Sequence, residues 1–239
     1  MASISDGAIQ KALKFIDGLA TDDRTSYYEI YENDPNERKE FPQSQYLLYV
    51  TFNEIGLQEL SSKIASRYDF SAVDTVDPNR AGRPANDCFC VLEGKIEPFR
   101  HAGKRDCKNN DEKALLSIYW LQRKDRLRGW LYRGYADDVW RQLAAKYDPS
   151  RSVLEMDCAD QKKQLYSVFK VALFGILAGK MGETELLASV RTRLRDWQDE
   201  SGGWKTDRTI DLQPQGYANL ETTALSILAL VDRLEPRTR

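Results

Sequence analysis

Two carboxylates near the end of the chain have the residue types and spacing that acid–base catalysis requires. Asp207 follows Trp204 in a polar segment, and Glu221 stands at the start of the last amphipathic segment. Two carboxyl groups on neighbouring elements can divide into an acid and a base when one environment is drier, as in glycoside hydrolysis and acid-initiated cyclisation. We therefore predict Asp207 and Glu221 as catalytic residues. The structural alternatives are a solvated loop aspartate and a glutamate that complements a helix dipole.

Aromatic and basic side chains gather in the loops between the predicted helices. An aromatic ring could stack on a sugar or stabilise a carbocation, although it could equally pack at a helix joint. An arginine suits an anionic group such as a uronate, sulfate or diphosphate, which argues against a pure hydrocarbon substrate. The candidate ligand-binding residues are Trp204, Tyr217, Trp130, Tyr135, Arg128 and Tyr27.

The sequence has few residues suited to metal binding or to catalysis by histidine. The chain has one histidine, His101, and four cysteines, so a His-based catalytic triad would depend on that single residue. Cys88, Cys90, His101 and Cys107 are suitable zinc ligands, but the Cys-x-Cys spacing departs from the usual Cys-x2-Cys. We expect small buried thiols, no metal site and no cofactor, and we look for catalysis among the carboxylates.

The overall composition excludes several classes of protein. Lysine and arginine total 35 against 37 aspartate and glutamate residues, a net charge of −2. A protein that binds nucleic acid through phosphates should carry a basic excess. The longest apolar run, 171–179, is far shorter than the roughly 20 residues that cross a bilayer. With no secretory signal evident at the start, we expect a cytoplasmic protein whose partner is a small-molecule or saccharide ligand.

Apolar spacing predicts helices through most of the chain. The predicted helical segments are 9–19, 44–68 with a break at Gly56, 115–122, 139–147, 165–177, 186–197 and 220–234. Prolines and glycines make an irregular insertion of about 71–109, within which a small hairpin could turn near Gly94. Asp157 with Asp160, and Asn219 with Glu221, have the arrangement of N-terminal helix caps.

A loose repeat combines a helix, an aromatic-rich loop and a second apolar helix, around residues 9–55, 111–178 and 185–235. The third copy contains Gln198, Gly202 and Trp204 in the pattern Gln-x3-Gly-x-Trp. Without reference to any family, this pattern suits a helix joint. The glutamine can bond free backbone groups at a helix end, the glycine permits a tight turn, and the tryptophan covers the joint.

This pattern resembles the QW repeat of squalene and oxidosqualene cyclases. The segment after it, 219–230, is similar to the inner helix that follows such a repeat in the terpenoid cyclase and protein prenyltransferase superfamily. The resemblance covers about residues 185–232 and implies an α/α toroid with a central cavity. The Asp-x-Asp-Asp motif of the cyclases and the zinc ligands of the prenyltransferases are missing from the sequence, so no catalytic residue carries over.

The sequence thus predicts one all-α domain over residues 1–239, a complete or incomplete α/α toroid interrupted at about 71–109. Its predicted function is to bind an organic ligand in a central cavity, with acid–base catalysis by a carboxylate pair. One alternative is a carbohydrate-active hydrolase or lyase on the same scaffold. Another is a non-catalytic binding or assembly module. The oligomeric state stays open.

Overall fold

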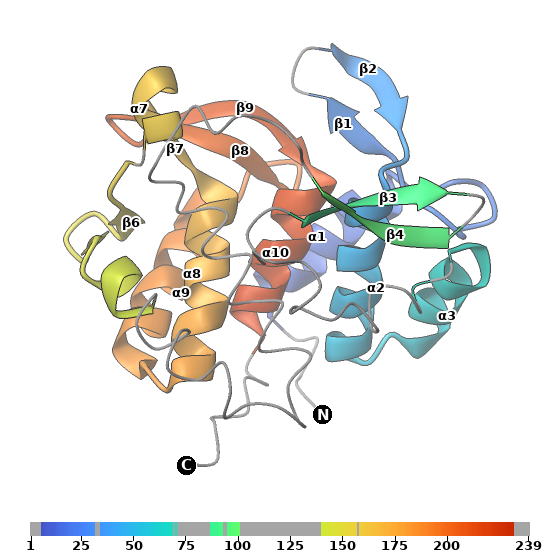
Figure 1. The fold of residues 1–239 in the computed structure, drawn as a ribbon, viewed down its shortest axis with the longest axis horizontal. Coiled ribbons are helices and arrows are strands. Elements are labelled where there is room, and N and C mark those ends of the chain that lie inside the picture. Colours follow the sequence, from blue (N-terminus) through green and yellow to red (C-terminus); the bar gives the residue numbers. More distant parts are fainter. Residues whose placement is uncertain are drawn as a thin grey trace.

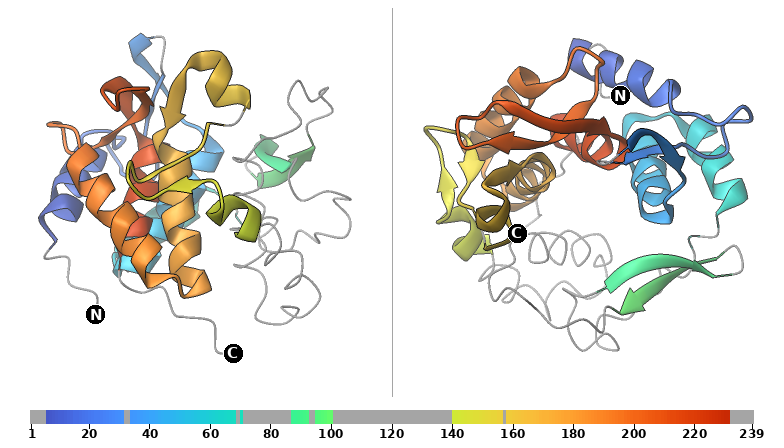
Figure 2. Two further views of the ribbon diagram at one scale, coloured as in Figure 1. Left: turned by 90° about the vertical axis from the view of Figure 1, so that its left-hand side faces the viewer. Right: turned by 90° about the horizontal axis from the view of Figure 1, so that it is seen from above.

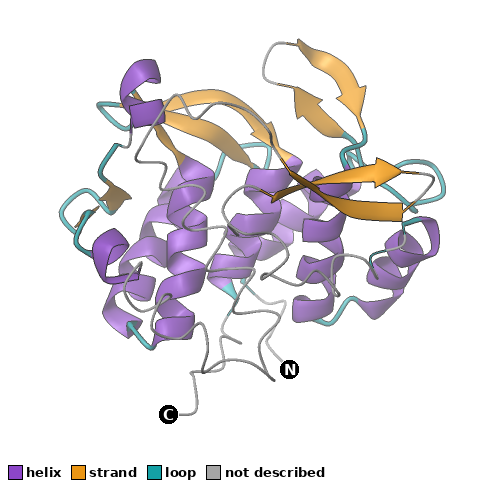
Figure 3. Ribbon diagram, in the orientation of Figure 1, coloured by secondary structure: helices purple, strands orange, loops and turns teal. Residues whose placement is uncertain are grey.

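A computed structural model describes residues 6–31, 34–68, 70, 87–92, 95–100, 140–156 and 158–231. Its helices are α1 (Gly7–Asp17), α2 (Pro42–Ile55), α3 (Gln58–Arg67), α7 (Cys158–Lys163), α8 (Val168–Met181), α9 (Thr184–Trp197) and α10 (Leu220–Leu230), with a further short turn of helix at 140–144. Its strands are β1 (Glu29–Tyr31), β2 (Asp34–Lys39), β3 (Asp87–Leu92), β4 (Lys95–Arg100), β5 (Tyr147–Asp148), β6 (Val153–Leu154), β7 (Leu165–Ser167), β8 (Trp204–Thr209) and β9 (Pro214–Asn219). Figures 1 and 3 show how they are arranged.

Helix α10 lies at the centre of the described structure, between α8 and α2 (Figure 1). Both α8 and α10 are apolar on nearly every side and are buried over most of their length, as expected for helices inside a core. By contrast α1 and α9 bury a single apolar stripe each and lie outside them. The core therefore runs along the row α8, α10 and α2.

Strands β1, β2 and β7–β9 lie on one side of this row, above the N-terminal ends of the central helices in Figure 1 (see also Figure 2). Helix α2 starts soon after β2, α8 directly follows β7, and α10 directly follows β9. Strand β8 pairs antiparallel with both β7 and β9, and β1 pairs with β2. Residues that end these strands are consequently placed beside helix N-termini.

The prediction of an all-α toroid is wrong. The described residues form a mixture of helices and small antiparallel sheets, and no closed toroid is present among them. Most of the missed strands, β1, β2, β8 and β9 among them, fall in segments that were expected to be loops, whereas β7 falls at the start of a predicted helix. Backbone N–H and C=O groups in such segments need partners when they pack onto a core, and cross-strand pairing supplies those partners.

Several predicted elements are nevertheless correct. The break at Gly56 separates α2 from α3, where Gly56 adopts a left-handed conformation with φ of 83°. The hairpin predicted around Gly94 is formed by β3 and β4. Helix α8 starts later than predicted, because 165–167 pair with β8 as strand β7. The helix predicted over 115–122 lies outside the described residues.

Candidate functional site

The candidate site lies where β7 passes into α8. Ser167 is the last residue of β7, is paired with Asp207 of β8, and occupies the N-cap position of α8. Its hydroxyl makes no capping bond to the helix. Instead, Ser167 Oγ donates to Asp160 Oδ1 at 3.0 Å and lies 3.4 Å from Asp207 Oδ1. One hydroxyl thus joins two carboxylates from different elements.

Lys170 completes this group one helical turn after Ser167. Its Nζ lies 2.9 Å from Asp160 Oδ2, and the two side chains are 4% and 7% exposed. Asp207 is also buried, with 7% of the residue exposed, whereas Ser167 is half-buried. Asp160, Ser167, Lys170 and Asp207 are called the Ser167 cluster below. Charges at this depth interact more strongly than surface charges, because little water screens them.

A glycine on β9 permits the close approach behind Asp207. A Cβ atom at Gly216 would lie 2.2 Å from Thr206 Oγ1 and 3.9 Å from Asp207 Oδ2, and Gly216 has φ of 78°. The register between β8 and β9 shifts between Lys205 and Asp207, next to this glycine. The hydroxyl of Thr206 is buried there without a hydrogen-bond partner. Glycine is the residue that fits both the backbone angle and the space.

The Ser167 cluster contains the groups that proton transfer and nucleophilic attack require. A hydroxyl within 3.0 Å of a carboxylate can lose its proton to it, and that carboxylate is oriented in turn by the ammonium of Lys170. The second carboxylate, Asp207, comes from a separate strand. Two carboxyl groups close together on separate elements can serve as an acid and a base.

The two predicted catalytic residues have different surroundings in the structure. Asp207 belongs to the Ser167 cluster, while Glu221 is the second residue of α10. The backbone N–H groups of Leu220 and Glu221 donate to the carboxylate of Glu29 at 2.7 and 3.1 Å. The prediction that Asp207 and Glu221 act as a pair stays a prediction.

Glu29 is a buried carboxylate that the sequence analysis missed. Besides the two α10 amides, it accepts a hydrogen bond from Ser44 Oγ of α2 at 2.7 Å. Burial raises the pKa of Glu29, and these hydrogen bonds oppose the rise. Because Glu29 joins β1 to the starts of α2 and α10, its first role is to hold three elements together.

Trp204 has the structural role that its motif predicts. The ring is fully buried, and its Nε1 donates to the carbonyl of Leu194 at 2.7 Å. Gln198 Nε2 donates to the carbonyls of Ala8 and Gly202, each at 2.7 Å, and so ties the end of α9 to α1. This bonding confirms the physical interpretation of Gln198 and Trp204 as residues of a helix joint.

Tyr27 lies in the core, 2% exposed, with its ring edge-on to Phe52 at 5.7 Å between centroids. Burial raises the pKa of Tyr27 to about 12. The side chain of Gln45 binds the backbone of Tyr27. Gln45 Nε2 donates to the carbonyl of Tyr27 at 2.6 Å, and Gln45 Oε1 accepts from the amide of Tyr27 at 2.9 Å. Of the packing and ligand-binding interpretations, the geometry of Tyr27 fits packing.

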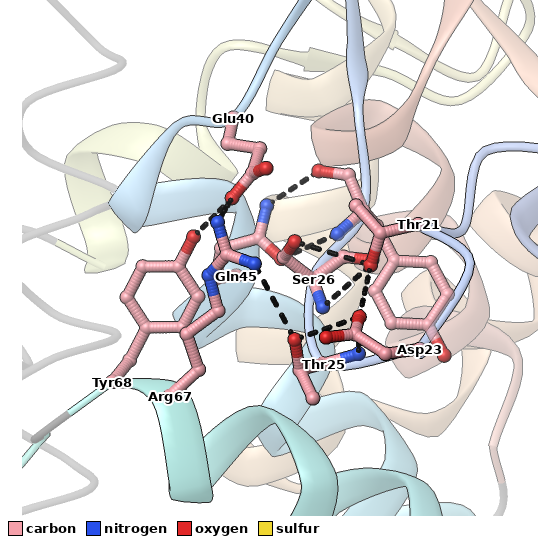
Figure 4. Close-up of polar contacts among 9 residues, drawn as sticks. Thr21, Asp23, Thr25, Ser26, Glu40, Gln45, Arg67 and Tyr68 are labelled. Carbon is pink, nitrogen blue, oxygen red and sulfur yellow. Dashed lines mark hydrogen bonds and ion pairs between the residues drawn. The ribbon is translucent and has the colours of Figure 1, made fainter.

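Figure 4 shows the polar contacts around this segment. Glu40 Oε2 accepts from Tyr68 Oη at 2.7 Å and pairs with Arg67 Nη2 at 2.8 Å. Arg67 also reaches Thr25 Oγ1 at 3.4 Å, and Asp23 organises that turn by accepting from Thr25. These contacts attach the loop before β1 to the end of α3, and they are more exposed than the Ser167 cluster.

The other predicted ligand-binding residues divide by position. Tyr217 is 39% exposed on β9, directly after Gly216, so its ring is accessible. Trp130, Tyr135 and Arg128 lie outside the described residues.

Arg208, another basic residue of this hairpin, is buried and stacks on Trp197, with its Cζ 5.1 Å from the ring centroid. Burial lowers the pKa of this guanidinium. Arg208 therefore packs against α9.

The predicted helix caps have separate outcomes. Asn219 caps α10 as expected, its Oδ1 accepting from the amide of Thr222 at 2.9 Å. Asp157, the expected cap of the helix around 160, lies outside the described residues. Asp160 was predicted to support that cap, and its carboxylate instead accepts from Ser167 and pairs with Lys170.

One sequence feature could have indicated the Ser167 cluster. Ser167 and Lys170 have Ser-x-x-Lys spacing at the start of a strongly apolar segment, which places both on one face of a helix. A lysine inside such a segment needs a buried partner. The sequence does not show which carboxylate supplies it, because that depends on how β7 and β8 pair.

The cysteines and histidine weighed as zinc ligands are only partly placed. Cys88 and Cys90 lie on β3, while His101 and Cys107 are outside the described residues. Within the part of the chain that the structure covers, no three His, Cys, Asp or Glu side chains are grouped so as to hold a metal ion.

Comparison with known proteins gives no relative. No family model, no curated protein and no solved structure matches the chain significantly. The resemblance of 194–204 to the QW repeat therefore stays a prediction. In the described ranges, no helix has the length and apolar character needed to span a membrane.

Proposed function

We propose that the protein is an enzyme that carries out acid–base chemistry on a small organic ligand, with Asp207 as the carboxyl group that exchanges a proton with the ligand. The observation that carries the proposal is the bridge from Ser167 Oγ to two buried carboxylates, 3.0 Å from Asp160 Oδ1 and 3.4 Å from Asp207 Oδ1. Proton transfer and charge stabilisation are most effective in such water-poor surroundings.

The separate elements that supply the two carboxylates support a division of roles. Asp160 faces the ammonium of Lys170 at 2.9 Å. Asp207 comes from strand β8 and lies beside the small Gly216 of β9. A pair of carboxyl groups on separate elements can take the parts of a catalytic acid and a base.

An exposed aromatic ring on the same hairpin as Asp207 supports an organic ligand. Tyr217 follows Gly216 on β9 and leaves 39% of its surface open. A flat or cyclic ligand, such as a sugar ring, can stack on a tyrosine. Glu221, at the start of α10, remains the predicted second carboxylate for such a ligand.

The proposal can be tested by measuring turnover on a ligand panel. The panel contains uronate-bearing oligosaccharides, isoprenoid diphosphates and carboxylic esters, with products detected by mass spectrometry. We expect the wild-type protein to convert at least one class and Asp207→Asn to lower the rate by about 100-fold or more, the usual effect of losing a catalytic acid or base. Glu221→Gln measures the contribution of the second predicted carboxylate.

Asp211→Asn is the matched control, because Asp211 lies in the exposed turn of the same hairpin. This variant should keep the wild-type rate. Equal rates for Asp207→Asn and the wild-type protein would refute the assignment, provided that both fold. Conversion of no ligand class would argue against an enzyme.

A non-catalytic binding or assembly module is the second candidate function. The burial of two predicted site residues favours this second candidate. Trp204 is fully buried, and Asp207 is 7% exposed. A module of this kind would use the Ser167 cluster only for stability. Asp207→Asn would then lower the free energy of unfolding without changing any turnover.

A further inference from the structure

We propose that Ser167 is the nucleophile of an acyl-transfer reaction, so that the ligand is a carboxylic ester or amide. This inference rests on the proposed function, because Asp207 and Asp160 move the protons. It adds a covalent step at a named atom, Ser167 Oγ, and it excludes ligands without an acyl group.

Ser167 has an unusual position for a serine at a helix N-terminus. It is half-buried, whereas the Asp160, Lys170 and Asp207 residues around it are at most 7% exposed. A serine at an N-cap ordinarily turns its oxygen to the helix amides. Ser167 does not, and its hydroxyl is directed to the carboxylates instead.

The hydroxyl of Ser167 is the first member of a chain of three polar groups. Ser167 Oγ donates to Asp160 Oδ1 at 3.0 Å, and Lys170 Nζ holds Asp160 Oδ2 at 2.9 Å. A nucleophile bonded to a base that is oriented by a third group is the general form of a catalytic triad. Lys170 acts through Asp160 and is a positioning residue.

The start of α8 can stabilise the negative charge that forms on an attacked carbonyl. Helix α8 has fourteen residues, begins directly after Ser167, and has no acidic residue in its first turn. The first amides of a helix lack partners within it, and its dipole favours negative charge there. The amides of Val168 and Phe169 are therefore the donors for the oxyanion.

The reaction balances with the groups present. Ser167 Oγ attacks the acyl carbon and its proton passes to Asp160. Asp207, in its acid form, protonates the leaving alcohol or amine as the C–O or C–N bond breaks. Water then attacks the acyl-serine and gives a proton to Asp207, while Asp160 returns its proton to Ser167 Oγ. The net reaction consumes one water and releases an acid and an alcohol or amine.

Covalent labelling with an alkyl fluorophosphonate tests the inference without a known substrate. The serine oxygen displaces fluoride, and the adduct is located by intact mass and peptide mapping. We expect one adduct, on Ser167, in the wild-type protein and in Ser150→Ala, a control in an exposed turn. Ser167→Ala should give no adduct, and Asp160→Asn should slow labelling by about 100-fold or more.

Lys170 is tested by rescue. Lys170→Met should slow labelling strongly, and Lys170→Arg should recover much of the rate, because a cation is again placed on Asp160. Circular dichroism and the urea midpoint of each variant separate loss of folding from loss of reactivity. A purely structural lysine would leave the labelling rate of every folded variant unchanged.

Absence of an adduct at residue 167 in the folded wild-type protein would overturn the assignment of Ser167 as the nucleophile. If an oligosaccharide or isoprenoid is still converted in an Asp207-dependent manner, the proposed function stands and only the acyl-transfer step fails. If neither labelling nor turnover occurs, both fail.

Discussion

At the residue scale, the interior holds charged groups that each require a specific partner. Lys170 and Asp160 are buried together, and Glu29 is buried against amides and a hydroxyl. Removing one member of a buried ion pair leaves the other charge without compensation, which costs more than the pair itself contributes. These residues therefore affect stability as well as any chemistry.

Lys170→Met should lower the free energy of unfolding by about 3–5 kcal/mol, because Asp160 would keep a buried charge without its ammonium. The double variant Lys170→Met with Asp160→Asn should recover a large part of that loss. Urea denaturation measures both.

Lys63 provides the control, since it pairs with Glu59 on the exposed side of α3 with an Nζ–Oε1 distance of 3.3 Å. Lys63→Met should cost less than about 1 kcal/mol. Equal losses at Lys63 and Lys170 would contradict the assignment of a buried pair.

Glu29 should make stability depend on pH. Burial raises its folded-state pKa above the ordinary value of 4.5. Its favourable contribution is therefore complete below the unfolded-state pKa and declines as pH rises through the folded-state pKa, by up to about 1.4 kcal/mol per pH unit. The difference in free energy of unfolding between the wild-type protein and Glu29→Gln should thus shrink from pH 4.5 upward.

Urea titrations across this pH range measure the effect. Glu59→Gln is the control because the Glu59 side chain is 85% exposed. The difference in free energy of unfolding between the wild-type protein and Glu59→Gln should vary little with pH. If the difference in free energy of unfolding between the wild-type protein and Glu29→Gln grew with pH, the hydrogen bonds to the carboxylate would outweigh its burial.

At the element scale, the joint between α9 and β8 depends on a turn that touches α1. Gly202 has φ of 94°, and a Cβ atom there would lie 2.3 Å from the backbone carbonyl oxygen of Lys11. Gly182, which ends α8, has a similar φ of 81° but open space around it. The two glycines separate the cost of backbone conformation from the cost of close packing.

Gly202→Ala should lower the free energy of unfolding by about 3 kcal/mol or more, because the strain of the left-handed conformation adds to a backbone clash. Gly182→Ala should cost only about 1–2 kcal/mol, the conformational part alone. Thermal or urea unfolding compares them. Similar losses at both positions would show that α1 moves away readily.

The sequence predicts elements more reliably than contacts between them. Helical periodicity locates α1, α9 and α10, and Gly56 marks a real helix end. The short strand β7 has no pattern of its own, since 165–167 become a strand only by pairing with β8. Asp207 can be identified as a candidate from its residue type, whereas its neighbours Ser167 and Asp160 depend on that pairing.

At the scale of the whole molecule, α8 and α10 should be the most stable parts of the described structure. Both are enclosed by other elements, while α3 lies at the edge against α2. Buried central elements commonly exchange their amide hydrogens only through global unfolding.

Native-state hydrogen exchange with mass spectrometry tests this order. Amides of α8 and α10 should have protection equal to the global free energy of unfolding, and those of α3 clearly less. The opposite order would contradict the central position of α10.

We propose that an organic ligand binds and reacts at the Ser167 cluster. The most direct measurement is a crystal structure of the protein soaked with the panel of oligosaccharides, isoprenoid diphosphates and esters, beside an identical soak of Asp207→Asn. We predict ligand density within hydrogen-bond distance of the Asp207 carboxyl and Ser167 Oγ in the wild-type crystal, weakened in the variant. Ligand density confined to another part of the protein, and equal in both crystals, would contradict binding and reaction at the Ser167 cluster.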